Sequence, residues 1–97
     1  MIVRVVKMSF QPDKVEEFLA DFDASKELIR AFDGCEHLEL LQDREHPNVL
    51  FTYSYWRDPS ALETYRSSEL FQRTWDRTKA LFNDKPVAWS LECRDSL

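Results

Sequence analysis

The chain has 97 residues, a net charge of -5 and a single glycine. This length suits one domain, residues 1–97, and so short a chain buries only about 60–65% of its unfolded surface, so association with another chain would add burial. The acidic balance argues against nucleic acid and anionic membranes as partners, because both would repel the protein. The single glycine excludes the glycine-rich loops that bind nucleotide phosphates.

The amino-terminal segment 1–10 is apolar but is interrupted by Arg4 and Lys7. It is too short and too charged for the core of a signal peptide, and no segment approaches the roughly 20 apolar residues of a membrane span. We therefore expect a cytoplasmic protein that does not enter a membrane.

The chain contains only two cysteines and two histidines that could serve as metal ligands. Cys35 and Cys93 lack the CxxC spacing and are expected to be free thiols, buried or half-buried. His37 and His46 stand nine residues apart without patterned carboxylate partners. We expect both histidines at the surface and predict no metal site.

Six regular regions are predicted in chain order. They are strands at 2–9, 35–42, 49–56 and 87–93, a helix from about 15 to 32, and a helical region from 59 to 82. Apolar residues occupy both faces of the first strand, which is typical of the centre of a sheet, whereas the mixed polarity of the second suits an edge. The first helix should end at Asp33-Gly34, because glycine is favoured in the left-handed backbone that follows a helix.

The segment 48–82 carries the clearest local signals. Asp58 is a favourable N-cap, and Pro59 fits the first turn of a helix. Glu63 is interpreted as a charge that stabilises the helix start rather than as a catalytic acid. Ser67-Ser68 is predicted to divide the helical region into two pieces.

The element order β-α-β-β-α-β predicts an α+β fold of the ferredoxin-like type, with an antiparallel sheet in the order 4-1-3-2 and both helices on one face. The opposite face would then expose an apolar patch larger than a monomer normally shows. We predict that a second copy covers this patch in a homodimer with sheets packed face to face. The predicted interface comprises Val3, Val5, Phe51, Tyr53, Tyr55, Trp89 and Leu91.

The second half of the chain carries a family resemblance. The residues concerned are Tyr55-Trp56, Asp58, Ala61-Leu62, Tyr65, Ser68 and Leu70-Phe71. With the element order, they resemble the antibiotic-biosynthesis-monooxygenase (ABM) superfamily of dimeric α+β barrels. The resemblance implies the fold and the dimer. It also implies three kinds of role: cofactor-independent oxidation of quinol-like aromatics, haem degradation, or the unassigned roles of many small members.

Three positions depart from the family pattern and shape the expected chemistry. The haem-degrading branch carries an Asn, a Trp and a His, and the matching positions are Lys7, Trp56 and Trp75. The axial histidine is therefore missing, and we predict that neither haem nor another cofactor binds. Many other members carry a His where this chain has Tyr65, which removes a group suited to proton transfer near neutral pH.

The expected site is an aromatic cavity between helices and sheet. Its predicted ligand-contacting residues are Trp56, Tyr65, Phe71, Trp75, Arg66 and Arg73, with either arginine pairing with a phenolate or carboxylate. The aromatic residues could instead be plain core, and the arginines solvated or at the dimer rim. The hypothesis is a cofactor-independent monooxygenase of small phenol- or quinol-like compounds, with no catalytic residue assigned. The alternative is a non-catalytic dimeric module that binds a small ligand or serves as an interaction domain.

Overall fold

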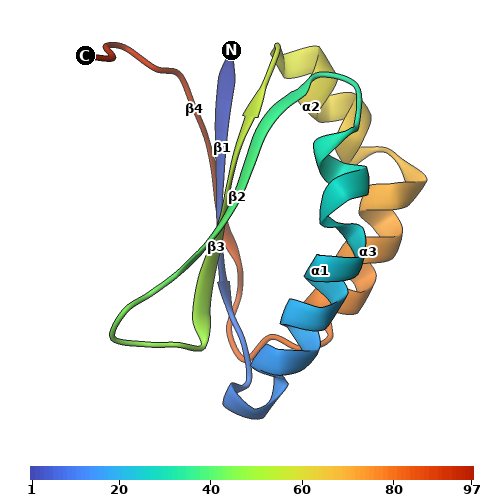
Figure 1. The fold of residues 1–97 in the computed structure, drawn as a ribbon, viewed down its shortest axis with the longest axis vertical. Helices are drawn as coiled ribbons and strands as arrows, with labels where there is room; N and C mark the ends of the chain where they lie inside the picture. The colour runs from blue at the N-terminus through green and yellow to red at the C-terminus, as the bar shows by residue number, and fades with distance from the viewer.

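The computed structural model describes residues 1–97, and it contains a four-stranded sheet and a layer of helices (Figure 1). The elements are β1 (Ile2–Ser9), the short 3-10 helix η1 (Pro12–Lys14), α1 (Val15–Arg30), β2 (Cys35–Gln42), β3 (Val49–Trp56), α2 (Pro59–Arg66), α3 (Glu69–Lys79) and β4 (Val87–Leu91). All helices lie on one face of the sheet and leave the other face uncovered (Figure 1).

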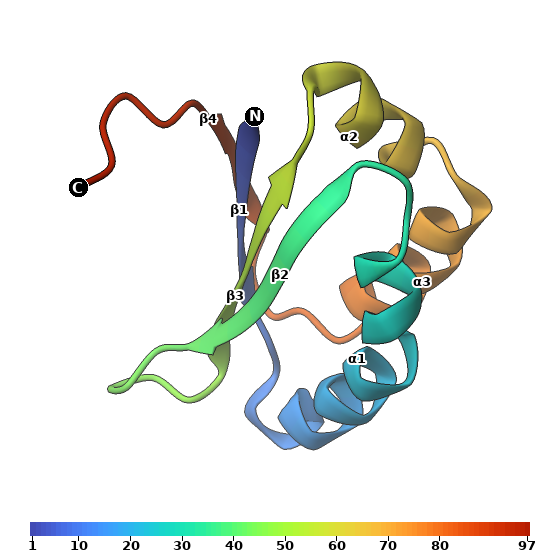
Figure 2. The same ribbon diagram turned by 45° about the horizontal axis from the view of Figure 1, so that its top comes forward.

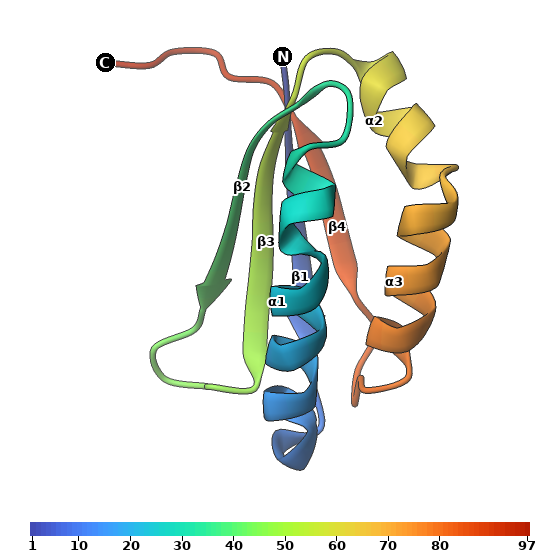
Figure 3. The ribbon, with the colours of Figure 1, turned by 45° about the vertical axis from the view of Figure 1, so that its right-hand side comes forward.

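The strand order is β2-β3-β1-β4, and every neighbouring pair is antiparallel. This arrangement confirms the predicted ferredoxin-like α+β fold, with β1 and β3 in the centre and β2 at an edge. Helices α1 and α3 run side by side across the covered face (Figure 3). After β4 the chain turns toward the uncovered face, away from the helices (Figure 2).

The core on the covered face is divided into two clusters at opposite ends of β1. One cluster contains Met8, Phe10, Val15, Phe18, Leu50 and Leu81, and the other contains Ile2, Cys35, Trp56, Ala61 and Leu62. Because side chains alternate along a strand, Arg4 and Val6 face the helices between these clusters. The middle of the covered face is therefore left for a site.

The local signals of the sequence act as predicted. The Asp58 carboxylate accepts a hydrogen bond from the Ala61 backbone N–H at 2.7 Å, which caps α2. The Ser68 hydroxyl accepts one from the Phe71 backbone N–H at 3.1 Å, so α3 starts as a separate helix. The predicted break between two helical pieces is confirmed.

Three sequence-based expectations need correction. The last strand ends at Leu91 instead of residue 93, because Leu91 already pairs with Val3 near the beginning of β1 and little partner strand remains. The first helix ends at Arg30, slightly before the predicted stop. Cys35 is a buried free thiol, but Cys93 follows the end of β4 and is exposed.

Gly34 joins α1 to β2 and combines two constraints on its backbone. Its φ is +88°, in the left-handed region, and a Cβ atom there would collide with the Cβ of Ala61. We expect Gly34→Ala to lower the free energy of unfolding by about 2–4 kcal/mol, because backbone strain adds to overpacking. Urea denaturation followed by circular dichroism measures this loss.

The Ala61→Gly background provides the control for this prediction. It removes the colliding atom but leaves the φ of residue 34 unchanged. Gly34→Ala should therefore cost less in that background than in the native chain, since neighbouring substitutions couple. Equal losses in both backgrounds would contradict the proposed collision.

Candidate functional site

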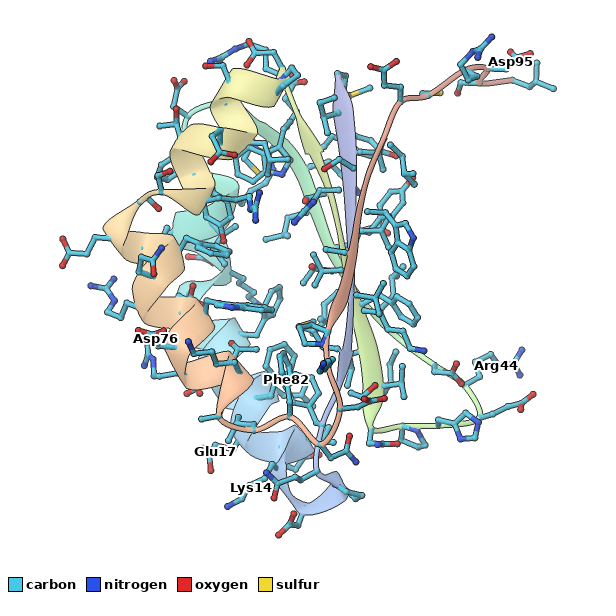
Figure 4. The ribbon with its side chains drawn as sticks, turned by 180° about the vertical axis from the view of Figure 1, so that it is seen from behind. Lys14, Glu17, Arg44, Asp76, Phe82 and Asp95 are labelled. Carbon is cyan, nitrogen blue, oxygen red and sulfur yellow. The ribbon has the colours of Figure 1, made fainter.

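A cavity of about 300 Å³ lies between the sheet and the helices. It lies between the two core clusters, and 12 of its 22 lining residues are hydrophobic. The side chain of Phe82 points into the space between helices and sheet at one end (Figure 4). The volume and the mostly apolar wall are typical of a site for a small molecule.

Aromatic rings form a continuous wall along α2 and α3. The Trp56 and Tyr65 rings stack with centroids 4.7 Å apart, and Phe71 meets the edge of Tyr65 at 5.3 Å. Phe71 and Trp75 then stack at 5.8 Å, and Trp75 contacts Phe82 at 5.6 Å. Such offset and edge contacts hold the rings in fixed orientations. The wall therefore presents ring faces and ring edges to the cavity in a fixed arrangement.

Trp56 anchors this wall to the sheet. Its side chain is only 1% exposed, and its Nε1–H donates a hydrogen bond to the Ser54 hydroxyl at 3.0 Å. The polar atom of the indole is thus satisfied inside the protein. Trp56 supplies a ring face to the cavity and no free donor.

Tyr65 contributes a neutral hydrogen-bond donor. Burial, and secondly the neighbouring Cys35 thiol, raises the pKa of its phenol to about 12. Every fully buried side-chain N or O atom has a hydrogen-bond partner. The Tyr65 hydroxyl has none within the protein, so its oxygen is not fully buried, and Tyr65 is one of the residues that line the cavity. At neutral pH it can donate a hydrogen bond but cannot act as a base.

Four charged side chains line the cavity. They are Arg4 on β1, Asp21 on α1, Arg66 on α2 and Arg77 on α3. Burial, followed by the positive charge of Arg66, lowers the pKa of Arg4, while Glu63 acts weakly in the opposite direction. Asp21 is the only carboxylate of the wall. The site thus combines one acid with several cations on an aromatic background.

The structure brings together most of the residues that the sequence suggested. Trp56, Tyr65, Phe71, Trp75 and Arg66 line the cavity. Arg73 does not: it is exposed on α3 and lies outside the cavity wall. The sequence reasoning missed Arg4, Asp21 and Arg77. For Arg4 a signal was available, because it shares the helix-facing side of β1 with Val6 and Met8.

The uncovered face gathers the residues of the predicted interface. The register pairs Val3 with Tyr55 and Leu91, and Val5 with Tyr53 and Trp89, while Phe51 pairs with Lys7 on the same face. Trp89 is 41% exposed and Leu91 47% exposed.

His37 also lies on the uncovered face, and one expectation about it was wrong. Its Nε2 is 2.7 Å from a carboxylate oxygen of Glu39, although no carboxylate partner was predicted. No group of three or more His, Cys, Asp or Glu side chains lies close enough together to hold a metal ion.

The chain belongs to the antibiotic biosynthesis monooxygenase family, whose family model matches residues 1–77. The fold closely matches the crystal structure of an antibiotic biosynthesis monooxygenase, with a TM-score of 0.91 at 18% identity over 98% of this chain and 100% of that chain. Rv0793 from Mycobacterium tuberculosis matches with a TM-score of 0.89 and 21% identity, over 98% of this chain and 96% of that one. At these identities the likeness concerns the fold.

Two further relatives carry functional names. A variant of SnoaB, a cofactor-independent oxygenase from Streptomyces nogalater, matches with a TM-score of 0.88 at 18% identity, over 99% of this chain and 95% of that chain. A protein of Natronomonas pharaonis with the provisional name of a heme-binding protein is 29% identical over 76 residues, which cover 78% of this chain and 13% of that protein. The match thus spans about an eighth of that relative. No helix of the present chain is long and apolar enough to cross a membrane.

Proposed function

We propose that this protein is a cofactor-independent monooxygenase that oxidises small phenol- or quinol-like aromatic compounds in the cavity. The observation that carries the proposal is the open cavity of about 300 Å³ with a continuous aromatic wall and charged groups inside. An aromatic oxidation would use the hydrogen-bond donor of Tyr65, the carboxylate of Asp21 and the arginines of the wall. A binding module would need only the donor and the arginines to hold its ligand.

The reaction draws its electrons from the substrate. In an anthrone-like compound, a CH₂ carbon between two rings loses both hydrogens and gains one oxygen atom as a carbonyl. The second atom of dioxygen leaves as water with those hydrogens. The protein has to orient the rings, accept a proton and stabilise the resulting anion.

The cavity wall offers a group for each of these tasks. The aromatic wall from Trp56 to Trp75 would orient the rings, and the Tyr65 hydroxyl would donate to a substrate oxygen. Asp21, as the only carboxylate of the wall, supports a role as proton acceptor. The cationic side chains favour the ionised substrate, because a nearby positive charge lowers the pKa of a phenol.

The residues do not fit haem as a resident group. The wall contains no histidine and no cysteine to bind the iron. Of the other possible ligands, Met8 is buried in the core and the Tyr65 phenol stays protonated because its pKa is raised to about 12. By the family resemblance, Trp75 stands at the position of the family histidine. His37 lies on the opposite face of the sheet, paired with Glu39. The name of the Natronomonas relative therefore gives no step in the proposed reaction.

Oxygen uptake tests the proposed activity. In buffer free of metals and flavin, an anthrone-like substrate should be consumed with equimolar oxygen, and the rate should rise as the substrate ionises. Tyr65→Phe keeps the ring but removes the hydroxyl, so we expect a rate about ten- to a hundredfold lower. An oxygen electrode measures the rate of oxygen uptake by the native protein and by the Tyr65→Phe variant.

Arg73→Ala is the matched control, because Arg73 is exposed and lies outside the cavity. Its rate should equal that of the native protein. If a panel of such compounds binds but gives oxygen traces identical to buffer, the protein is a binding module and the oxygenase proposal fails.

We also propose that the protein acts as a homodimer through the uncovered sheet face. Three residues of β4, Val87, Trp89 and Leu91, are between 41% and 47% exposed on that face. They adjoin the tyrosines of β3 across β1. A contiguous apolar surface of this kind marks an association site.

A further inference from the structure

A row of polar residues crosses the cavity floor beside an otherwise apolar surface. Arg4 in the centre of the sheet pairs with Ser54 on one side and Ser90 on the other. The next row toward Phe82 contains Thr52, Val6 and Ala88. Arg4 is thus a single cation on the floor.

The guanidinium of Arg4 is only partly satisfied by the protein. Its Nη1 donates to the Ser90 hydroxyl at 2.9 Å. No carboxylate lies within ion-pair distance of Arg4, since every ion pair of the protein involves other residues. A planar guanidinium has five N–H donors. Several of them remain free for a ligand.

Arg66 is a second cation near Arg4. Arg66 lines the cavity, and its charge is close enough to lower the pKa of Arg4. Arg66 pairs with the exposed Glu63 only at 3.7 Å. Two guanidiniums that repel each other are stabilised when an anion lies between them.

The charge of the wall is opposite to the charge of the whole chain. Three arginines and one aspartate line the cavity, whereas the protein carries a net charge of -5. A cleft lined mainly by one sign of charge concentrates its potential and attracts ligands of the other sign.

The arrangement also fixes how a ligand would lie. Arg4 is near the Trp56–Tyr65 end of the aromatic wall, because it is only two residues from Ile2, which pairs with Trp56. The wall continues from there to Phe71 and Trp75. If the anionic group of a ligand lay at Arg4, the rings of the same molecule would lie against the aromatic wall.

We propose that Arg4 and Arg66 form an anion-binding subsite, and that the cavity selects aromatic compounds that carry an ionised oxygen group, a carboxylate or an acidic phenolate. This inference rests on the proposed function, since it assumes that the cavity holds an aromatic ligand. It adds the charge of the substrate and its orientation.

Matched ligands test the subsite. Calorimetry compares the binding of 2-naphthoate with that of 2-naphthamide, which has the same rings and no charge. A second comparison uses 4-nitrophenol above and below its pKa, to test an ionised phenol in place of a carboxylate. We expect the carboxylate to bind about ten- to a hundredfold more tightly than the amide. Added salt should weaken only the charged ligand. Whichever anion shows the larger preference over its neutral form identifies the class.

Arg4→Gln should abolish the preference for the anion while leaving amide binding unchanged. Arg66→Gln should reduce the same preference. Arg66 is exposed on a helix, so this substitution should leave the fold intact. Arg73→Gln removes an equal charge outside the cavity and should change nothing. Equal binding of acid and amide, unaffected by Arg4→Gln, would overturn the subsite but leave the ligand cavity intact. Binding of none of the compounds would overturn both.

Discussion

The Trp56→Ala variant is expected to lose about 3–5 kcal/mol of unfolding free energy. Trp56 is 1% exposed and stacks on Tyr65 with ring centroids 4.7 Å apart. Its ring also meets Phe32 at 6.5 Å, and its Nε1–H bonds Ser54. Alanine would leave a cavity that joins the existing one. The ring contacts with Tyr65 and Phe32 and the hydrogen bond to Ser54 would be lost. Urea denaturation at fixed protein concentration measures the loss.

Leu28→Ala is the control, since Leu28 is 56% exposed on α1. It should change the unfolding free energy by less than about 0.5 kcal/mol. Similar losses for both variants would contradict the role of Trp56 as the anchor of the aromatic wall. Because Trp56→Ala should be severely destabilised, its activity cannot separate folding from chemistry. Tyr65→Phe and Arg4→Gln separate them better.

The fold was predictable because its boundaries are set by local chemistry. Asp58 and Ser68 each cap a helix through their own side chains, and Gly34 takes the left-handed backbone that few other residues adopt. The end of β4 could not be found in this way. A strand ends where its partner ends, and the pairing of Leu91 with Val3 is a property of the sheet.

The aromatic half of the site and Arg66 were predicted from the sequence, whereas Arg4, Asp21 and Arg77 were not. Phe71 and Trp75 are four residues apart on α3, and this spacing indicates a shared helix face, whatever the ligand. Strand alternation alone places Arg4 on the helix-facing side of β1. Its contact with Ser90, 86 residues away in sequence, depends on the sheet register. Asp21 and Arg77 are polar residues on amphipathic helices, and a helical pattern alone places such residues toward solvent.

The pair formed by His37 and Glu39 was missed although the sequence contained the signal. Residues two apart on a strand project from the same face, so strand geometry by itself places the Glu39 carboxylate beside His37. His37 also contacts the Tyr55 ring at 4.8 Å, which joins the pair to the proposed dimer interface.

Tyr53→Glu is expected to convert the proposed homodimer to monomers. Tyr53 lies near the middle of the uncovered face, paired with Val5 on β1 and Glu39 on β2. A carboxylate at this position would be buried between the sheets without a partner and beside Glu39. An uncompensated buried charge costs about 3–5 kcal/mol, which weakens association by more than about a hundredfold.

Light scattering at micromolar concentration measures the change. The native chain should give twice the monomer mass of 11.6 kDa, and the variant should give a mass near 11.6 kDa. Leu28→Glu adds the same charge to the helical side, at a residue that is 56% exposed, and should remain dimeric. Circular dichroism distinguishes a folded monomer from an unfolded chain. A native mass near 11.6 kDa would refute the dimer, and a dimeric Tyr53→Glu variant would move the interface away from this face.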